Sequence, residues 1–373
     1  TGKSNCLYFI DDGMTALISL VNGLTLKDKN LCEKLPSEIL RHVFKIIYED
    51  GLNDRAEMLE DLYTCIQVNK RWCETAMPIL WSNIIPSASV INVYMSFFTP
   101  DERNELISKG IPFQKISTKS SLTFCYPSFL RVLNLHEFSS AIFHWCLQEC
   151  RQPISIQYNI LLRGLLVILA RHCKTLQQLH LDRRLLLDNM HHELWLLLHE
   201  LTTRNLITSV RKLCLDVRKI INEDCLRLLC EYCRHLVDMT LVEPFWSWDS
   251  RIAQLISSQK YLCSFIMKRG KCTDALISAL ESHTNSLRLI HFRRVDFSKC
   301  TSIGTFKSDC KNLEVLIIHG CKYLSGNVRE ELINASFPKL VELDVNGTDF
   351  DGAMVSWNNC VGRRNENQEL KFY

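Results

Sequence analysis

Cysteine and histidine are the residues of this chain that could do chemistry, and their spacing decides which chemistry. The sequence holds 18 cysteines and 12 histidines. Cys230 and Cys233 form a CxxC pair, but no second pair follows at the spacing that a structural zinc site needs. His191, His192 and His199 do not form HExxH, and neither GxxxxGK nor GxSxG occurs. We therefore expect no catalytic residue, no metal and no cofactor, and a protein that is not an enzyme.

The cysteines are expected to be reduced thiols in an intracellular chain. The apolar stretch from Met14 to Val21 follows Asp11 and Asp12 instead of the basic residues of a secretory signal. A chain of 373 residues also has enough apolar material for a core without a disulfide framework. We expect a cytoplasmic or nuclear location, or both, with residues 1–31 as a poorly ordered or incomplete leader.

Charge and hydropathy argue against nucleic acid and membrane partners. The formal net charge is only +3, and the arginine pairs are scattered along the chain. The best apolar run, Leu165 to Ala170, lies between Arg163 and Arg171. It is far shorter than the ~18 uncharged residues that span a bilayer, so we expect a buried helix face.

The strongest pattern in the sequence is an internal repeat of the form LxxLxL, in which other apolar residues can replace leucine. The copies begin at Leu130, Leu176, Val210, Leu236, Leu262, Leu287, Leu313 and Leu340. From Val210 onward the intervals are 26, 26, 25, 26 and 27 residues, whereas the first two, of 46 and 34, hold insertions. A nearly constant interval predicts an array of similar structural units.

Each unit is expected to be one short strand followed by one helix. The last two apolar residues of a copy lie two positions apart, so they point to the same side of a strand. Helical spacing follows, as in Leu226, Leu229, Cys230 and Cys233. One strand and one helix cannot bury their apolar faces alone, so neighbouring units must stack. Helices are wider than strands, so we predict an α/β horseshoe with a parallel sheet on its concave side.

The copies resemble the cysteine-containing class of leucine-rich repeats. Cys173, Cys233 and Cys310 each precede the first residue of a copy by three positions, and Cys321 lies just past a predicted strand. The resemblance implies a solenoid of leucine-rich repeats over residues 121–348, with these cysteines as small buried apolar side chains.

The residues between and just after the buried positions would face the concave side, where a substrate could bind. The column just after the strands changes from acidic, at Asp182 and Asp216, to basic, at Lys268 and Arg293. This charge step either orients a protein substrate or is a solvated face with unselected charges. The other concave residues predicted to bind substrate are His180, His291 and His319.

An aromatic loop follows the strand that ends at Leu241. It contains Phe245, Trp246 and Trp248. These side chains either anchor a bound substrate, as hot-spot residues do in interfaces, or pack over the ends of the neighbouring helices.

Residues Leu35 to Ile84 lack the repeat and carry helical patterns instead. The segment LPSEILRHVF (35–44) has a proline that suits a first helical turn, followed by an apolar stripe. CIQVNKRW (65–72) lies in a second helical block, and PILW (78–81) follows. In this order and at these places the three segments resemble the F-box, a short helical motif, which we assign to residues 32–85.

The resemblance implies that this module binds the adaptor subunit that joins F-box proteins to a cullin scaffold. By that carry-over the adaptor-binding residues are Leu35, Pro36, Ile39, Leu40, Val43, Phe44, Trp72 and Trp81. Some of them could instead fill the core of a three-helix unit, and for Val68 and Trp72 a place in the core is an equal alternative.

Two features depart from the F-box pattern. The connection from Tyr48 to Asp61 is longer than usual and acidic. It is either a neutral surface insertion or a change that affects how tightly the adaptor docks. Asn69 stands where many members of the family have cysteine.

The patterns together predict the organisation and the function of the chain. The expected parts are a leader (1–31), the F-box (32–85), a linker and N-terminal cap (86–120), the repeats (121–348), and a C-terminal cap and tail (349–373). We predict the substrate-recognition subunit of an SCF-type cullin ubiquitin ligase, with the repeats binding a protein substrate for ubiquitination. The alternative is a leucine-rich-repeat scaffold that acts outside any ubiquitin ligase.

Overall fold

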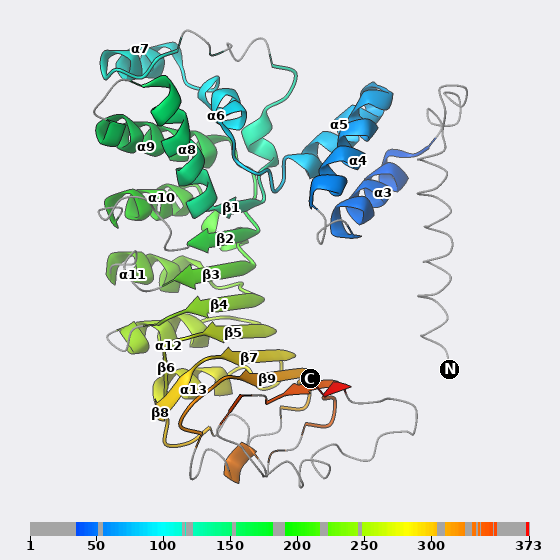
Figure 1. Ribbon diagram of the computed structural model, residues 1–373, viewed down its shortest axis with the longest axis vertical. Coiled ribbons are helices and arrows are strands. Elements are labelled where there is room, and N and C mark those ends of the chain that lie inside the picture. Colours follow the sequence, from blue (N-terminus) through cyan, green and yellow to red (C-terminus); the bar gives the residue numbers. More distant parts are fainter. Residues whose placement is uncertain are drawn as a thin grey trace. The chain divides into compact units, whose positions relative to one another are not determined.

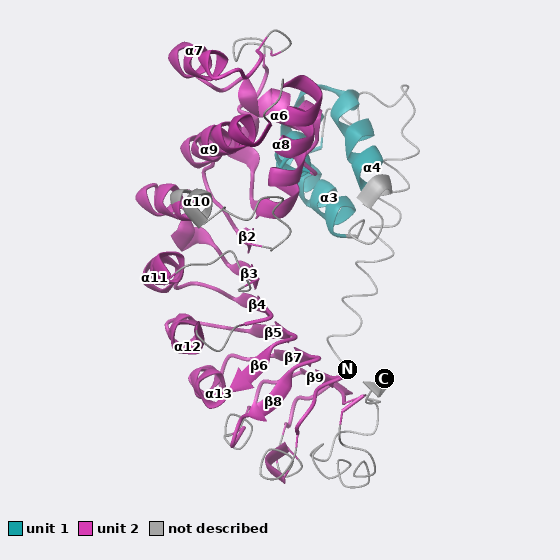
Figure 2. Ribbon diagram, turned by 60° about the vertical axis from the view of Figure 1, so that its left-hand side comes forward, with its two compact units in different colours: residues 1–84 teal, residues 85–373 magenta. Residues whose placement is uncertain are grey.

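The computed structural model describes part of the chain, and this part folds as two units. The described residues are 35–50, 55–113, 116, 122–150, 154–181, 191–216, 223–244, 248–303, 310–324, 330–332, 335, 337–345, 347–348 and 371–372. Unit 1 is Thr1–Ile84 and unit 2 is Ile85–Tyr373, coloured teal and magenta in Figure 2.

The described part of unit 1 contains α3 (Ser37–Asp50), α4 (Arg55–Val68) and α5 (Lys70–Leu80), each in contact with the other two. The apolar residues of α3 recur at helical spacing, so they lie on one face. The core of unit 1 is formed by Leu40, Val43, Phe44 and Ile47 from α3, Met58, Leu62 and Cys65 from α4, and Trp72 and Ala76 from α5.

The connection predicted between Tyr48 and Asp61 is largely helical, so the prediction of a long loop was wrong. Helix α3 continues to Asp50 and α4 begins at Arg55, with residues 51–54 outside the described part. Met58 and Leu62 lie one turn apart and are both buried in the core. This apolar pair gives α4 a face to pack, and packing is what stabilises a short helix.

Asn69 divides the predicted second helical block into two helices. Its backbone is extended, and its side chain accepts a hydrogen bond from the backbone N–H of Trp72 at 2.9 Å, so it caps α5. Helix α4 therefore ends at Val68, whose side chain is 45% exposed. The alternative that placed Val68 in the core was wrong, whereas Trp72 is buried.

Unit 2 contains an open parallel sheet, as predicted. Among the described residues its nine strands follow the order β1-β2-β3-β4-β5-β7-β9-β10-β11, and every neighbouring pair is parallel. The strands are β1 (Val132–Asn134), β2 (Gln178–Leu181), β3 (Lys212–Asp216), β4 (Asp238–Val242), β5 (Ser264–Lys268), β7 (Leu289–Arg293), β9 (Val315–His319), β10 (Glu342–Asp344) and β11 (Lys371–Phe372). In Figure 1 strands β1, β2, β3, β4, β5, β7 and β9 stack in chain order.

Helices line one side of this sheet (Figures 1 and 2). They are α8 (Leu135–Glu149), α9 (Ile154–His172), α10 (His191–Thr203), α11 (Glu223–Tyr232), α12 (Asp249–Ser257) and α13 (Asp274–Glu281), and consecutive helices are in contact. Before them come α6 (Ala88–Met95), α7 (Pro100–Ser108) and the 3-10 turn η3 (Tyr126–Phe129). Helix α6 contacts α8, where Trp145 donates a 2.7 Å hydrogen bond to Asn92.

The second apolar residue of each repeat copy contributes to one continuous buried row. Cross-strand register places Leu179, Leu213, Met239, Phe265, Ile290, Leu316 and Leu343 side by side. None is more than 4% exposed. Because side chains alternate along a strand, the residues on either side of this row lie on the opposite face.

Polar side chains join consecutive repeat units at the residue that opens each copy. Ser209 accepts a hydrogen bond from the backbone N–H of Leu176 at 3.0 Å, and the side chain of Gln259 accepts one from that of Leu236 at 3.0 Å. Ser286 donates to the carbonyl of Leu262 at 2.7 Å. Such bonds satisfy backbone groups that would otherwise be buried without partners.

A second small sheet was not predicted. Strands β6 (Lys271–Thr273) and β8 (Asp296–Lys299) pair in parallel, just after β5 and β7. Phe297 of β8 packs edge-on against Phe292 of β7, with ring centroids 5.3 Å apart. The two-strand sheet is therefore attached to the main core through aromatic packing.

Helix α9 is long and apolar enough, by length and composition, to cross a membrane, and no other helix in the described ranges is. Half of its most apolar window is buried within the protein, and it contacts both α8 and α10. Leu165, Leu166 and Leu169 are among its buried residues. A core helix meets the same criterion, so the finding is weak support for a membrane span.

Candidate functional site

The structure divides the residues predicted to bind an adaptor into a buried and an exposed group. Leu40, Val43, Phe44 and Trp72 form the core of unit 1, and none is more than 4% exposed. The rings of Phe44 and Trp72 meet edge-on with centroids 5.3 Å apart. These four side chains hold the helices together and present no surface to a partner, so the core-filling alternative describes them.

The exposed group lies at the start of α3 and the end of α5. Pro36 and Ile39 are exposed, Ile39 by 46%, whereas Leu35 and Trp81 are half-buried. Val68 is equally exposed, although its helical spacing did not predict a place at the surface. Each of these is an apolar side chain that the described part of unit 1 leaves at least partly uncovered.

A hydrogen bond links the starts of α3 and α5, close in the sequence to the exposed aliphatic residues Ile39 and Val68. The guanidinium of Arg71, at the start of α5, donates to the hydroxyl of Ser37, at the start of α3, over 3.1 Å. Ile39 follows Ser37 closely, and Val68 precedes Arg71 at the end of α4. We call this surface the Ile39–Val68 end.

The basic residues predicted to bind a substrate are neighbours across strands. Lys268 of β5 pairs with Arg293 of β7, and Arg293 pairs with His319 of β9. Arg293 is exposed and Lys268 is half-buried. His319 lies 3.2 Å from the carboxylate of Asp344 on β10, through Nδ1 and Oδ2. We call Lys268, Arg293 and His319 the basic row.

His291 lies on the same face, two residues before Arg293. Its cross-strand neighbours are Ile266 and Ile317. Burial lowers the pKa of His291, and the positive charges of Lys268 and Arg293 lower it further. The ring is therefore neutral at neutral pH, and it continues a less polar strip beside the basic row. His180, farther along the sheet in β2, is half-buried.

Other predicted substrate residues do not join this group. Asp216 is 1% exposed, so its assignment to the exposed face was wrong. It is the last residue of β3, where the alternation of side chains between the two faces ends. Asp182, Phe245 and Trp246 lie outside the described residues, and Trp248 is half-buried just before α12. Of the predicted change from acidic to basic residues on the exposed face, the basic residues therefore remain and Asp216 does not.

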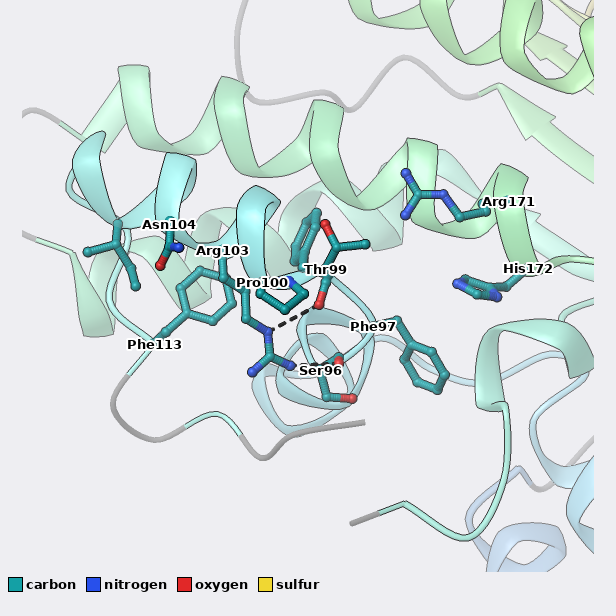
Figure 3. Close-up of a pocket in the computed structure, with 11 residues that line it drawn as sticks. Ser96, Phe97, Thr99, Pro100, Arg103, Asn104, Phe113, Arg171 and His172 are labelled. Carbon is teal, nitrogen blue, oxygen red and sulfur yellow. Dashed lines mark hydrogen bonds between the residues drawn. The ribbon is translucent and has the colours of Figure 1, made fainter. Parts of the chain in front are cut away.

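A cavity of about 720 Å³ in unit 2 lies beside α7 and the end of α9 (Figure 3). Its walls include Phe97, His172, Phe113 and Arg103. The guanidinium of Arg103 donates to the carbonyl of Ser96 at 2.7 Å and lies 5.7 Å from the centre of the Phe113 ring. The rings of Phe97 and His172, on the other side, are tilted relative to each other with centroids 5.4 Å apart. The cavity is mostly apolar. The guanidinium of Arg103, a charged wall residue, is bound to the backbone of the protein itself.

An ion pair next to this cavity gives the fold a pH dependence. Arg171 of α9 donates to both carboxylate oxygens of Glu102 of α7, at 2.6 and 3.2 Å. These bonds, with those from Thr99, lower the pKa of Glu102 from 4.5 to about 2 against the opposing effect of burial. A carboxyl group with a lowered pKa stabilises the fold above its unfolded pKa. This stability is lost as the pH falls through the folded pKa.

We therefore expect α7 to detach from α9 as the pH falls from about 4.5 to about 2. Amide hydrogen exchange in α7, measured across this range, should show the loss of protection. Glu102→Gln should make protection nearly independent of pH there. If the variant shows the same pH dependence as the parent, another group is responsible.

Cys230, in α11, and Cys233, just after this helix, are buried and unreactive. Burial raises the pKa of Cys233 to about 12, and Cys230 donates weakly to the carbonyl of Arg251 at 3.5 Å. Protonated, buried thiols are poor nucleophiles and poor ligands. Within the described ranges, no three His, Cys, Asp or Glu side chains come together as a possible metal site.

Comparison with known proteins identifies the N-terminal unit. A family model of F-box-like domains matches residues 32–87, which include α3, α4 and α5. A comparison with curated proteins found no match. The chain therefore carries an F-box-like domain, which confirms the prediction for this segment and supports an F-box protein. The match ends at residue 87, before the repeats.

Proposed function

Because residues 32–87 match F-box-like domains, we propose that this protein is the substrate-recognition subunit of an SCF-type cullin ubiquitin ligase. F-box domains bind an adaptor subunit that connects them to a cullin. In this proposal unit 1 binds the adaptor, and unit 2 binds a protein substrate for ubiquitination in the cytoplasm or nucleus. The observation that carries the proposal is the family match.

The surface of unit 1 supports an adaptor contact at the Ile39–Val68 end. Ile39 and Val68 are large aliphatic side chains, and each is almost half exposed. A helical unit of this size buries little apolar surface by itself, so covering these side chains with a partner would stabilise it. Phe44 and Trp72 would act indirectly, because they fix the helices that present this surface.

The backbone of unit 2 supports leucine-rich repeats that form a horseshoe with a concave sheet. A left-handed backbone conformation recurs seven residues after the start of successive copies, at Glu243, Arg269, Arg294, Gly320 and Gly347. A positive φ is uncommon outside glycine. Its return at the same repeat position means that β4, β5, β7, β9 and β10 are followed by a similar turn, as expected if these units are true structural repeats.

The proposed mechanism is proximity instead of catalysis by this chain. A substrate held on unit 2 would be brought near a ubiquitin-charged enzyme that other subunits hold, so its effective concentration would rise. The residues of this chain would bind and orient, and the chain itself would not be an enzyme. The alternative is a leucine-rich-repeat scaffold outside any ligase, in which the F-box-like helices bind no adaptor.

Adaptor capture by the purified full chain tests this proposal. We expect the parent to capture adaptor and cullin, and Ile39→Asp with Val68→Asp to weaken capture more than about tenfold. Charges placed on an apolar contact cannot be buried there without a large cost. Both side chains are exposed, so the variant should stay folded, as hydrogen exchange in α3 to α5 would show.

Tyr63→Asp is the matched control, because Tyr63 is also exposed on α4, at 58%. It should leave capture unchanged. A folded parent that captures no adaptor would overturn the ligase proposal in favour of the scaffold. Capture that survives in the Ile39 and Val68 variant would place the adaptor elsewhere on unit 1.

A further inference from the structure

We propose that the exposed sheet face around the basic row binds an extended acidic segment of the substrate, one rich in aspartate or glutamate. This inference rests on the proposed function in one respect, that unit 2 is where the substrate binds. It adds the chemistry of the bound segment and the residues that recognise it.

Positive charge is concentrated at the carboxyl ends of two neighbouring strands. Lys268 and Arg293 end β5 and β7 and pair in register. Arg269 and Arg294 follow them directly and are exposed. Neighbouring strands lie ~4.8 Å apart, so the backbones of these four residues lie close together at the ends of β5 and β7. Mutual repulsion in such a group is relieved when a negatively charged ligand binds.

Most of this charge has no acidic partner in the part of the chain that the structure describes. Arg269 forms an ion pair with Glu243 at 2.9 Å. Among the residues that the structure describes, Lys268, Arg293 and Arg294 form no ion pair. Side chains that are accessible, positive and unpaired are available to carboxylates from another molecule.

The surface next to the charges fits a peptide better than a polyanion. Ile266, His291 and Ile317 lie side by side, each two residues before a member of the basic row on its own strand. Each is half-buried. The His291 ring is neutral, so this strip can cover an aliphatic side chain. Successive side chains of an extended peptide point in opposite directions, so residues two apart can present carboxylates to one surface.

The spread of the charges favours separated carboxylates over a single phosphate. Lys268 and Arg293 lie on different strands, and His319 on the next strand is held by Asp344. A phosphate is bound best where several donors converge on one point.

Fluorescence anisotropy with the full chain tests this inference. The probe is a short labelled peptide in which glutamate alternates with valine. We expect the parent to bind it and Lys268→Glu with Arg293→Glu to weaken binding by about tenfold or more. The same peptide with lysine in place of glutamate should not bind. A peptide with phosphoserine in place of glutamate should bind no tighter than the glutamate peptide.

Lys174→Glu with Lys260→Glu is the matched control variant. Both lysines are exposed, they precede β2 and β5, and the change in net charge is the same. This variant should bind like the parent. Equal weakening in both variants, no weakening in either, or much tighter binding of the phosphoserine peptide would each overturn the inference.

Adaptor capture by the same preparations separates this inference from the proposed function. Loss of peptide binding with full adaptor capture in the Lys268 and Arg293 variant is the expected result. If the peptide binds the parent as expected but no adaptor does, the ligase proposal fails and the acidic-peptide surface stands. If the adaptor binds and the peptide does not, the acidic-peptide surface fails alone.

Discussion

Phe44→Ala is expected to lower the free energy of unfolding of the F-box-like unit by about 3–5 kcal/mol. The side chain is fully buried and packs edge-on against Trp72, between three helices that meet at this point. Removing the ring leaves a cavity that α3, α4 and α5 cannot close without losing contacts elsewhere. A small unit has little stability to spare, so a loss of this size should unfold most molecules locally.

Hydrogen exchange of the full chain would measure this effect where it occurs. Protection should disappear from α3 to α5 and persist in β3 to β9, which belong to unit 2. Adaptor capture should be lost together with protection. Ile39→Ala is the control, because it shortens a side chain that is 46% exposed, so protection should be unchanged. A Phe44→Ala variant with parental protection would show that the three-helix core does not depend on this ring.

The parallel sheet of unit 2 and its α/β character were predictable because the sequence pattern that specifies them is local and repeated. The apolar positions of each copy predict which two residues of a strand are buried. The constant interval predicts that equivalent residues of neighbouring strands lie side by side. Met239, Phe265 and Ile290 lie side by side for this reason. The same logic predicts that Lys268, Arg293 and His319 form one row, since they occupy the same repeat position.

Features that depend on a single side chain were harder to predict. Asn69 is a good cap, but its effect, to end α4 and expose Val68, depends on where the helices meet. The acidic stretch before Asp61 looked like a loop because it holds many charged residues. Only Met58 and Leu62 show that α4 has an apolar face to bury. The position of Asp216 in the repeat predicted an exposed side chain. It is buried instead, because Asp216 is the last residue of β3, where the alternation of side chains ends.

The resemblance of the N-terminal segment to a family predicted positions but not burial. It assigned both Phe44 and Ile39 to the adaptor contact, although Phe44 is buried between the helices and Ile39 faces solvent. A helical stripe broad enough to face two surfaces cannot be divided by spacing alone, because the packing angles of α4 and α5 decide which part is covered. The fold of the unit is what separates a contact residue from a core residue.

The polar connections between repeats could not be predicted either, and one of them should have a large effect. The Gln259 side chain accepts from the backbone N–H of Leu236 at 3.0 Å and donates to the carbonyl of Cys233 at 2.7 Å. It is 5% exposed, so these groups are shielded from water. A buried backbone group left without a partner costs about 1–3 kcal/mol.

Gln259→Leu should therefore destabilise unit 2 by about 2–5 kcal/mol, because two buried backbone groups lose their partner at once. Leucine nearly fills the same volume, so the loss reports the hydrogen bonds and not a cavity. Hydrogen exchange should show lower protection first around α11 and β4, on either side of the broken connection.

Ser258→Ala is the matched control for Gln259→Leu, one residue earlier on the same turn. Ser258 donates to the carbonyl of Leu255 at 2.9 Å, and that carbonyl also accepts from Gln259 at 2.7 Å. Removing the hydroxyl thus leaves no group unpaired, and stability should change little. Equal stability of both variants would mean that the backbone at 233 and 236 finds other partners. The repeats would then be held together by their apolar row alone.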